Sequence, residues 1–150
     1  MNWHLKAFND LSLRDLYDLL KLRQEVFVVE QTCPYLDADG ADEQALHLYA
    51  RNNADEMIAY ARLYLATADT GYSRIGRVIT HEKVRGQKLG VEVMQRSIDY
   101  LEEYAPKAPI RVGAQVYLLK FYQSFGFEAI SEEYLEDDIP HIDMQRKAAQ

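Results

Sequence analysis

The segment from Arg74 to Gly90 constrains the fold more than any other part of the chain. It begins with strand-like residues up to Ile79, passes through a polar turn, and enters a helical pattern through Arg85-Gly86-Gln87-Lys88-Leu89-Gly90. The first N–H groups of a helix have no intrahelical acceptor, and the helix dipole adds partial positive charge there. Glycine lets the backbone approach a ligand closely. A strand, a glycine-containing loop and a helix start therefore predict a site for a phosphorylated ligand.

Composition and charge favour one globular domain that spans residues 1–150. Hydrophobic residues make up 48% of the chain and charged residues 27%, and the formal net charge is −7. Such a charge would repel a polyanion, so we expect no nucleic-acid partner. Cys33 is the only cysteine, which excludes an internal disulfide. Neither a run of roughly 18 apolar residues nor a signal-peptide pattern is present, so we expect a cytoplasmic protein without membrane contact.

Hydrophobic periodicity predicts the order β α β β β α β α β β, which is a mixed α/β domain with helices packed on a central sheet. Ser12 is a candidate cap for the first helix, and Gly126 stands where a helix C-terminal cap prefers glycine. The expected strands cover residues 3–8, 46–51, 57–65, 72–79, 110–114, 127–134 and 142–146, and the expected helices cover residues 12–28, 86–104 and 117–124.

Two motifs in this framework resemble those of the GNAT N-acetyltransferase superfamily, whose members bind acetyl coenzyme A. The loop from Arg85 to Gly90 is similar to the family's Gln/Arg-x-x-Gly-x-Gly/Ala motif, with Lys88 in place of the usual central glycine. The aromatic segment from Phe121 to Phe127 is similar to the family's later motif, and Gln115 stands where the family often has asparagine. The resemblance implies the acyl-CoA N-acyltransferase fold, a central twisted, mostly antiparallel sheet flanked by helices.

Three further segments resemble the ElaA-type branch of that superfamily, which is usually described as predicted acetyltransferases. They are the residues from Arg23 to Gly40, the pair His47-Leu48, and the residues from Glu133 to Ile142. The branch implies no particular acceptor, so polyamines, aminoglycosides, amino acids, other small amines and protein amines all stay open.

The resemblance also implies roles for individual residues. The backbone of Val78 and Ile79 would pair with the pantetheine arm, and the loop that follows would bind the pyrophosphate. Tyr122 would act as general acid toward the departing sulfur, although a packed aromatic residue is the plain alternative. The residues expected to contact acetyl-CoA are Val78, Ile79, Arg85, Gly86, Gln87, Lys88, Leu89, Gly90, Gln115 and Tyr122.

The sequence does not identify the general base. An attacking amine must be neutral, although lysine-like amines are mostly protonated at neutral pH, so some group has to accept a proton. The candidates are His47, His141, His81, Glu25 and Glu30, of which the first two lie in branch-like segments at predicted strand ends. Direct attack by the amine needs no enzyme nucleophile, so a catalytic role for the lone cysteine is not required.

We therefore expect an acetyl-CoA-dependent N-acetyltransferase that acts on a primary amine by direct attack in a ternary complex. The acidic segments at residues 37–42 and 132–138 are the hypothesis for a wall that receives a cationic amine. The first lacks the spacing of a calcium loop, so no metal is expected. A non-catalytic acyl-CoA-binding module and a ligand-free interaction domain are the competing hypotheses. A sheet edge near the C-terminus allows a homodimer.

Overall fold

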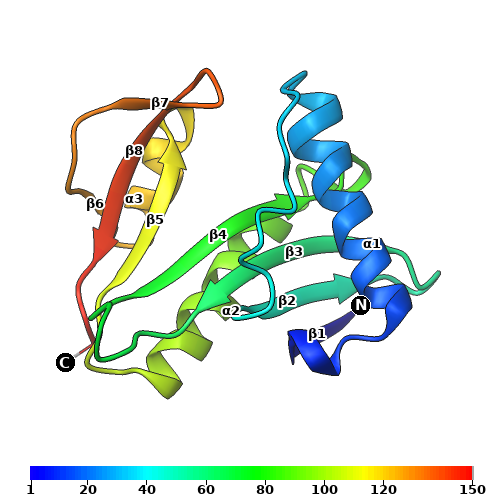
Figure 1. The fold of residues 1–150 in the computed structure, drawn as a ribbon, viewed down its shortest axis with the longest axis horizontal. Helices are drawn as coiled ribbons and strands as arrows, with labels where there is room; N and C mark the ends of the chain where they lie inside the picture. Colours follow the sequence, from blue (N-terminus) through cyan, green and yellow to red (C-terminus); the bar gives the residue numbers. More distant parts are fainter. Residues whose placement is uncertain (150) are drawn as a thin grey trace.

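Eight strands form one twisted, mostly antiparallel sheet in the computed structural model, which describes residues 1–149 (Figure 1). Their order across the sheet is β1-β2-β3-β4-β5-β8-β6, with β7 paired to β8. Every pairing is antiparallel except that of β4 with β5. The strands are β1 (Asn2–Ala7), β2 (Leu46–Arg51), β3 (Met57–Tyr64), β4 (Ser73–Thr80), β5 (Ile110–Gln115), β6 (Glu128–Ala129), β7 (Tyr134–Glu136) and β8 (Ile139–Arg146). This confirms the predicted fold class.

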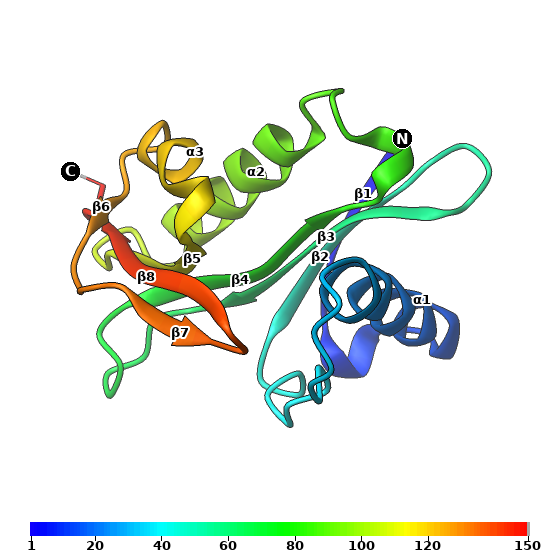
Figure 2. The ribbon, with the colours of Figure 1, turned by 90° about the horizontal axis from the view of Figure 1, so that it is seen from above.

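Helices cover both faces of the sheet. Figure 2 shows α1 (Leu13–Arg23) on one face, and α2 (Leu89–Tyr104) and α3 (Leu119–Gln123) on the other. The Ser12 hydroxyl accepts a hydrogen bond from the Asp15 N–H at 3.0 Å, and the Asp15 carboxylate accepts one from the Ser12 N–H at 3.3 Å. This reciprocal pair is a capping box, so the predicted start of the first helix is confirmed.

The helices bury apolar stripes that create a separate core on each face. The predicted apolar face of α2 is confirmed, since its members pack against the sheet; they are Leu89, Val93, Met94, Ser97, Ile98 and Leu101. On the opposite face, Leu19 and Leu22 of α1 pack with Tyr60 and Ile79 of the sheet. The central strands are therefore buried from both sides, and this packing holds them in place.

The parallel pair β4 and β5 separates part-way along its length. Pairing runs only from Ser73 opposite Ile110 to Ile75 opposite Val112. Beyond that point β4 stays paired with β3 as far as Thr80, while β5 stays paired with β8. Figure 1 shows the two strands diverging from their shared end. The edge of β4 after Ile75 therefore presents backbone N–H and C=O groups that no neighbouring strand uses.

A bulge in β4 accompanies this divergence. The register with β3 places Tyr60 opposite Ile79 but Arg62 opposite Gly76, so Arg77 and Val78 share one partner position. Arg77 has a φ of 49°, which a side chain larger than glycine rarely adopts. Bulges bend a strand and redirect its side chains, and this one turns the second half of β4 away from β5.

The structure corrects several predicted boundaries. The first helix changes geometry after Arg23 and continues as a π-helical segment, Gln24–Glu30. The helix predicted from residue 86 begins at Leu89, because residues 86–88 form the turn before it. The strand predicted over residues 127–134 is divided into β6 and β7, and β8 begins at Ile139 rather than at residue 142. None of the helices in residues 1–149 is long and apolar enough to cross a membrane.

Candidate active site

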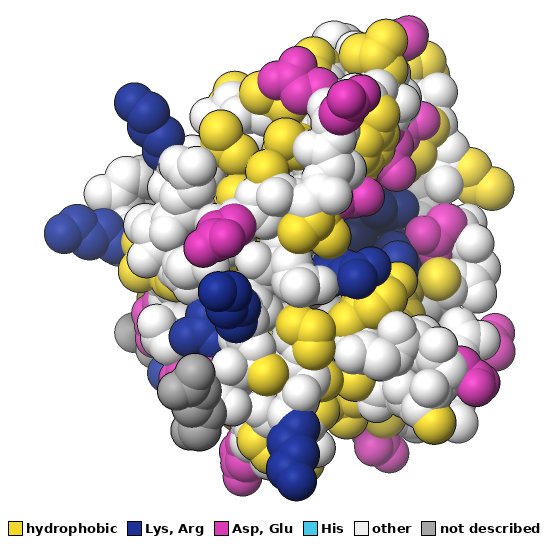
Figure 3. Space-filling view, turned by 90° about the vertical axis from the view of Figure 1, so that its left-hand side faces the viewer, with side chains coloured by type: hydrophobic (Ala, Val, Ile, Leu, Met, Phe, Trp, Pro, Cys, Tyr) yellow, Lys and Arg dark blue, Asp and Glu magenta, His cyan; other side chains and the backbone are white. Residues whose placement is uncertain are grey.

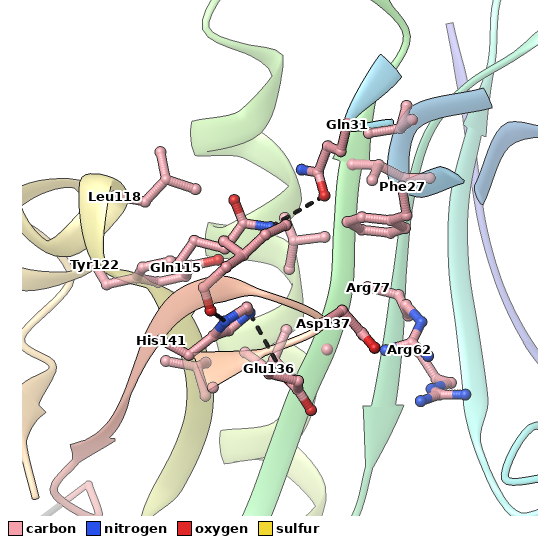
Figure 4. Close-up of a pocket in the computed structure, with 18 of the residues that line it drawn as sticks. Phe27, Gln31, Arg62, Arg77, Gln115, Leu118, Tyr122, Glu136, Asp137 and His141 are labelled. Atoms are coloured by element: carbon pink, nitrogen blue, oxygen red, sulfur yellow. Dashed lines mark hydrogen bonds and ion pairs between the residues drawn. The ribbon is translucent and has the colours of Figure 1, made fainter. Parts of the chain in front are cut away.

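A cleft of about 940 Å³ lies where β4 and β5 diverge. One wall is the free edge of β4 from Gly76 to Thr80, and the other is the end of β5 together with Tyr122 of α3. The π-helical segment and the β7–β8 hairpin border the cleft from opposite sides (Figure 4). Gln115 and Gln31 reach toward each other across it, with the Gln115 Nε2 3.4 Å from the Gln31 Oε1. The cleft therefore gives access to the unpaired edge of β4 along its whole length.

The predicted phosphate loop lies at one end of this cleft and lines a smaller depression of about 290 Å³. Gly86 has a φ of 87°, and Lys88, the N-cap of α2, has a φ of 59° and makes no side-chain capping bond. The first-turn N–H groups of a 16-residue helix thus lack a capping side chain. Gly90 also faces this depression, whereas Gln87 lines neither hollow. The donor set fits an anionic phosphate group.

Arg85 connects this loop to the π-helical segment. Its guanidinium lies 2.9 Å from the Glu30 carboxylate and also donates to the Thr80 carbonyl oxygen at 3.2 Å. Glu30 is therefore occupied by an ion pair, which makes it a poor candidate for the general base. The ion pair instead holds the loop at Arg85 against the π-helical segment that borders the cleft.

Tyr122 lines the cleft from α3. Its ring is buried edge-on against Phe121 and Phe127, with ring centroids 5.3 and 6.1 Å away. Its hydroxyl forms no hydrogen bond with residues 1–149, and Figure 4 shows it directed into the cleft toward Gln115. Burial, with a smaller contribution from Tyr117, raises the pKa of Tyr122 to about 12. The hydroxyl therefore keeps its proton at neutral pH.

His141 lies on β8, directly opposite Gln115 of β5 in the strand register, so it belongs to the same wall of the cleft as the end of β5. Its Nδ1 is 2.7 Å from the Ile139 carbonyl oxygen, which can only accept, so Nδ1 carries the proton. Its Nε2 then keeps a free lone pair and lies 3.4 Å from the Glu136 carboxylate. The imidazole stacks on Tyr134 with ring centroids 6.0 Å apart. Nε2 is therefore the ring nitrogen of His141 that can accept a hydrogen bond or a proton.

The structure does not place His47 at the cleft. Its side chain, on β2, is fully buried, and burial lowers the pKa of the imidazole. Nε2 donates to the Asp42 carbonyl oxygen at 3.0 Å, and Nδ1 accepts from the Tyr60 hydroxyl at 2.6 Å. Both ring nitrogens are occupied, so His47 supports the fold instead of accepting a proton from substrate. His81 and Glu25 pair with each other at 3.5 Å and also lie outside the cleft lining.

The acidic loop at residues 37–42 is not an open wall for a cationic amine. Asp37 and Asp42 are buried, and three arginines neutralise the loop's carboxylates. The ion pairs are Arg23 with Asp37 and Asp42 at 2.7 Å each, Arg62 with Asp39 at 2.8 Å and Asp42 at 3.0 Å, and Arg77 with Asp37 at 2.9 Å and Asp39 at 3.4 Å. No cluster of acidic, histidine or cysteine side chains in residues 1–149 could hold a metal ion.

The comparisons with known proteins identify the family. The sequence pattern of the acetyltransferase (GNAT) domain matches residues 21–148. The chain belongs to the GNAT acetyltransferase family. This GNAT chain is 43% identical to the protein ElaA of Escherichia coli over its full length, which covers 99% of that protein, and 38% identical to a fission-yeast protein, Schizosaccharomyces pombe UPF0039 protein C11D3.02c, over 93% of each chain.

Solved structures agree with this assignment. A crystal structure of an acyl-CoA N-acyltransferase from Pseudomonas aeruginosa superposes with a TM-score of 0.91 at 42% identity, covering 97% of this chain and 99% of that one. The crystal structure of Escherichia coli ElaA gives a TM-score of 0.91 at 43% identity, covering 98% of this chain and all of that one. The chain is thus a GNAT-family acyltransferase of the ElaA-type branch, as its motifs indicated.

Several cleft residues of this GNAT protein were not predicted from the sequence. Gln31 lies in a segment that resembles the branch, but no pattern assigned it a place, whereas Glu136 belongs to the acidic segment at residues 132–138 and does line the cleft. Arg74 and Arg111 occupy outward positions of two strands, between buried neighbours. That alternation is visible in the sequence, whereas the pairing of the two strands is not.

Proposed function

We propose that this protein is an acetyl-CoA-dependent N-acetyltransferase that transfers the acetyl group to a primary amine by direct attack in a ternary complex. The observation that carries the proposal is the free edge of β4, which leads from an uncapped helix start at Lys88 to the unpartnered hydroxyl of Tyr122. A pyrophosphate would meet the helix start, an extended chain with amide groups would meet the β4 edge, and a thioester would meet the Tyr122 hydroxyl.

Specific residues of the chain would hold the cofactor. The backbone of Val78 and Ile79 would pair with pantetheine amides as an added strand does. The N–H groups from Gly86 to Gly90 would bind the pyrophosphate, with Arg85 or Lys88 adding charge, and Gln87 and Leu89 lie within the same loop. Gln115 lines the cleft and would lie beside the thioester end. Acetyl-CoA supplies the activated acetyl group, and every other step falls to the chain and the acceptor.

The proposed reaction forms one bond and breaks one. The neutral amine nitrogen attacks the thioester carbonyl carbon, the new N–C bond forms, and the C–S bond breaks with its electron pair leaving on sulfur. His141 Nε2 accepts the proton that the nitrogen loses, directly or through water. In the balanced reaction the proton lost by the nitrogen passes from His141 through solvent to the thiolate, which becomes the thiol of coenzyme A, and the other product is the N-acetyl amide.

Tyr122 would assist the departing sulfur. A thiol of the cysteine type has a pKa of about 8.5, below the value of about 12 to which burial raises the pKa of Tyr122. Complete proton transfer from the phenol to the thiolate is therefore uphill. That order supports a role for Tyr122 as a fixed hydrogen-bond donor during C–S cleavage, with general-acid character limited to the transition state.

One experiment separates this proposal from its alternatives. The wild-type protein and Tyr122→Phe are tested for stabilisation by acetyl-CoA and for thiol release across a panel of primary amines. At 100 times its Kd, acetyl-CoA should add about 2.7 kcal/mol to the free energy of unfolding of both proteins. Tyr122→Phe should lower kcat about 100-fold, whereas the exposed control Tyr104→Phe should not.

The outcomes point in different directions. Stabilisation without product from any amine would replace the proposal with a non-catalytic acyl-CoA-binding module. The absence of stabilisation would favour an interaction domain without a ligand. Full turnover by Tyr122→Phe would remove that residue from the mechanism and leave the activity in place.

A further inference from the structure

Two arginines lie side by side in the cleft, at the end where β4 and β5 are still paired. Arg74 and Arg111 occupy directly opposite positions in the parallel register. Their neighbours along each strand are buried against α2, so both arginine side chains stand on the other face of the sheet. Both line the same cleft as Tyr122. Figure 3 views this side of the molecule and shows Lys and Arg side chains gathered in a hollow.

Each of the two guanidinium groups is held by an aromatic ring rather than by a carboxylate. Arg74 lies over the Tyr64 ring at 4.7 Å, and Arg111 lies over the Tyr72 ring at 4.0 Å. Arg111 Nε also donates to the Gln145 Oε1 at 2.9 Å. Within residues 1–149, neither arginine forms an ion pair, and their remaining N–H groups have no acceptor. The stacking fixes their orientation while leaving the forked ends available.

Two adjacent positive charges are unfavourable unless an anionic group binds to them. Like charges directly opposite each other on neighbouring strands destabilise a sheet. The other two arginines on this face, Arg62 and Arg77, are each neutralised by aspartates. A guanidinium fork matches the geometry of a carboxylate or phosphate through two parallel hydrogen bonds. The unneutralised pair is therefore a built site for an oxyanion.

We propose that Arg74 and Arg111 bind an anionic group of the acceptor, so that the substrate is a primary amine that also carries a carboxylate or phosphate. This inference rests on the proposed acetyl transfer and narrows its substrate class. Val78, which the proposed function pairs with the pantetheine arm, is four residues from Arg74, which at the rise of a strand is about 13 Å. Because arginine side chains can lean along the strand, the amine and the oxyanion are separated by on the order of 10 Å.

The oxyanion takes no part in the bond changes. The amine nitrogen still forms the N–C bond, the C–S bond still breaks, and the same proton still leaves the nitrogen. The arginine pair contributes by positioning, because it holds the far end of the acceptor and directs the amine toward the thioester. Its effect should accordingly be seen in KM and in the choice between acceptors more than in kcat.

The test compares acceptors that differ in one group. Acetylation of ω-aminooctanoate and of aminohexyl phosphate is measured against n-octylamine, which has the amine without the oxyanion. The wild-type protein should favour at least one oxyanion acceptor by about tenfold in kcat/KM, the scale of one hydrogen bond to a charged group. In Arg74→Gln and in Arg111→Gln that ratio should fall toward one through a higher KM. Arg96→Gln is the matched control, because Arg96 stacks on Trp3 at 4.6 Å outside the cleft.

The results distinguish this inference from the proposed function. Turnover of n-octylamine at the same kcat/KM as both oxyanion acceptors would overturn the inference alone, as would variants that keep the wild-type ratio. If no amine is acetylated, the proposed function fails, and calorimetric titration of ω-aminooctanoate into the coenzyme-A-saturated protein decides the inference. Binding that both arginine variants weaken would support the site, and an absence of such binding would overturn it.

Discussion

The most direct test of the structure replaces Arg23 with methionine. Arg23 is fully buried at the end of α1 and makes three short hydrogen bonds to the loop at residues 37–42. Its Nε and Nη1 each lie 2.7 Å from a carboxylate oxygen, of Asp37 and Asp42 respectively, and its Nη2 lies 2.9 Å from the Asp37 carbonyl oxygen. Methionine keeps the apolar part of the side chain and removes the charge and all three donors.

The expected loss follows from what the two carboxylates retain. Breaking a buried ion pair by removing one partner costs about 3–5 kcal/mol, because the other charge is left buried. Here Asp37 keeps Arg77 at 2.9 Å and Asp42 keeps Arg62 at 3.0 Å, so neither is left alone. We therefore expect the lower end of that range, a decrease of about 3 kcal/mol in the free energy of unfolding.

Urea denaturation followed by circular dichroism measures this loss. With a typical slope for a small protein, a 3 kcal/mol decrease lowers the midpoint by on the order of 1–2 M urea. Arg14→Met is the matched control on the same helix, since its exposed guanidinium pairs loosely with Asp18 at 3.7 Å and Asp55 at 3.4 Å. That variant should lose less than about 1 kcal/mol. Equal losses in the two variants would refute the assignment of Arg23 as the centre of a buried network.

Three further changes test other parts of the structure. Arg62 lowers the pKa of Asp39, and for Asp42 the bonds from Arg23 and Arg62 outweigh a burial that would raise the pKa. The lowered pKa values of these carboxyl groups add stability that is complete above about pH 4 and is lost as the pH falls below it toward the pKa values of the folded state. The urea midpoint should therefore fall steeply below about pH 4, and less steeply in Asp39→Asn. Lys88→Gly relieves the strain of a left-handed backbone conformation but adds conformational entropy to the unfolded chain, so the free energy of unfolding should change by less than about 1 kcal/mol. Coenzyme A affinity, measured by calorimetry, should fall at low salt. An unchanged affinity would exclude Lys88 from the phosphate site. His141→Gln should lower kcat about 100-fold in the thiol-release assay with acetyl-CoA binding intact, and an unchanged kcat would remove His141 as the base.

Local patterns were sufficient to predict most elements of the fold. The capping residue Ser12, the apolar stripe of α2 and the turn at Gly126 each depend on neighbours a few residues away, and each is found as expected. The bulge at Arg77 and the divergence of β4 from β5 were not predicted. Both depend on pairing between segments far apart in the chain, and a short strand pattern contains no record of its partner.

The same distinction applies to the site predictions. The loop predicted to bind phosphate is one continuous segment, so its residues could be named together, and its binding of phosphate stays a prediction. His47 was a reasonable candidate until Tyr60, from the next strand, was seen to occupy its ring nitrogen. Arg74 and Arg111 are inconspicuous in sequence, since only the register of two strands shows that they are neighbours.

Only one of the two acidic segments is open to a ligand, and the sequence alone does not show which. The aspartates at residues 37–42 are occupied by internal ion pairs, whereas Glu136 and Asp137 of the segment at residues 132–138 line the cleft. The charges left for a ligand lie at several places in the cleft, and Asp143, which accepts from the Tyr134 hydroxyl, is one of them. Glu136 and Asp137 are near His141, and Arg74 and Arg111 are near the closed end of the strand pair. Charges within one cleft act more strongly than the distant field of the whole protein, because screening removes the distant terms. A cleft that is negative beside His141 and positive at its far end favours an acceptor with the opposite polarity, which carries an ammonium group at one end and an oxyanion at the other.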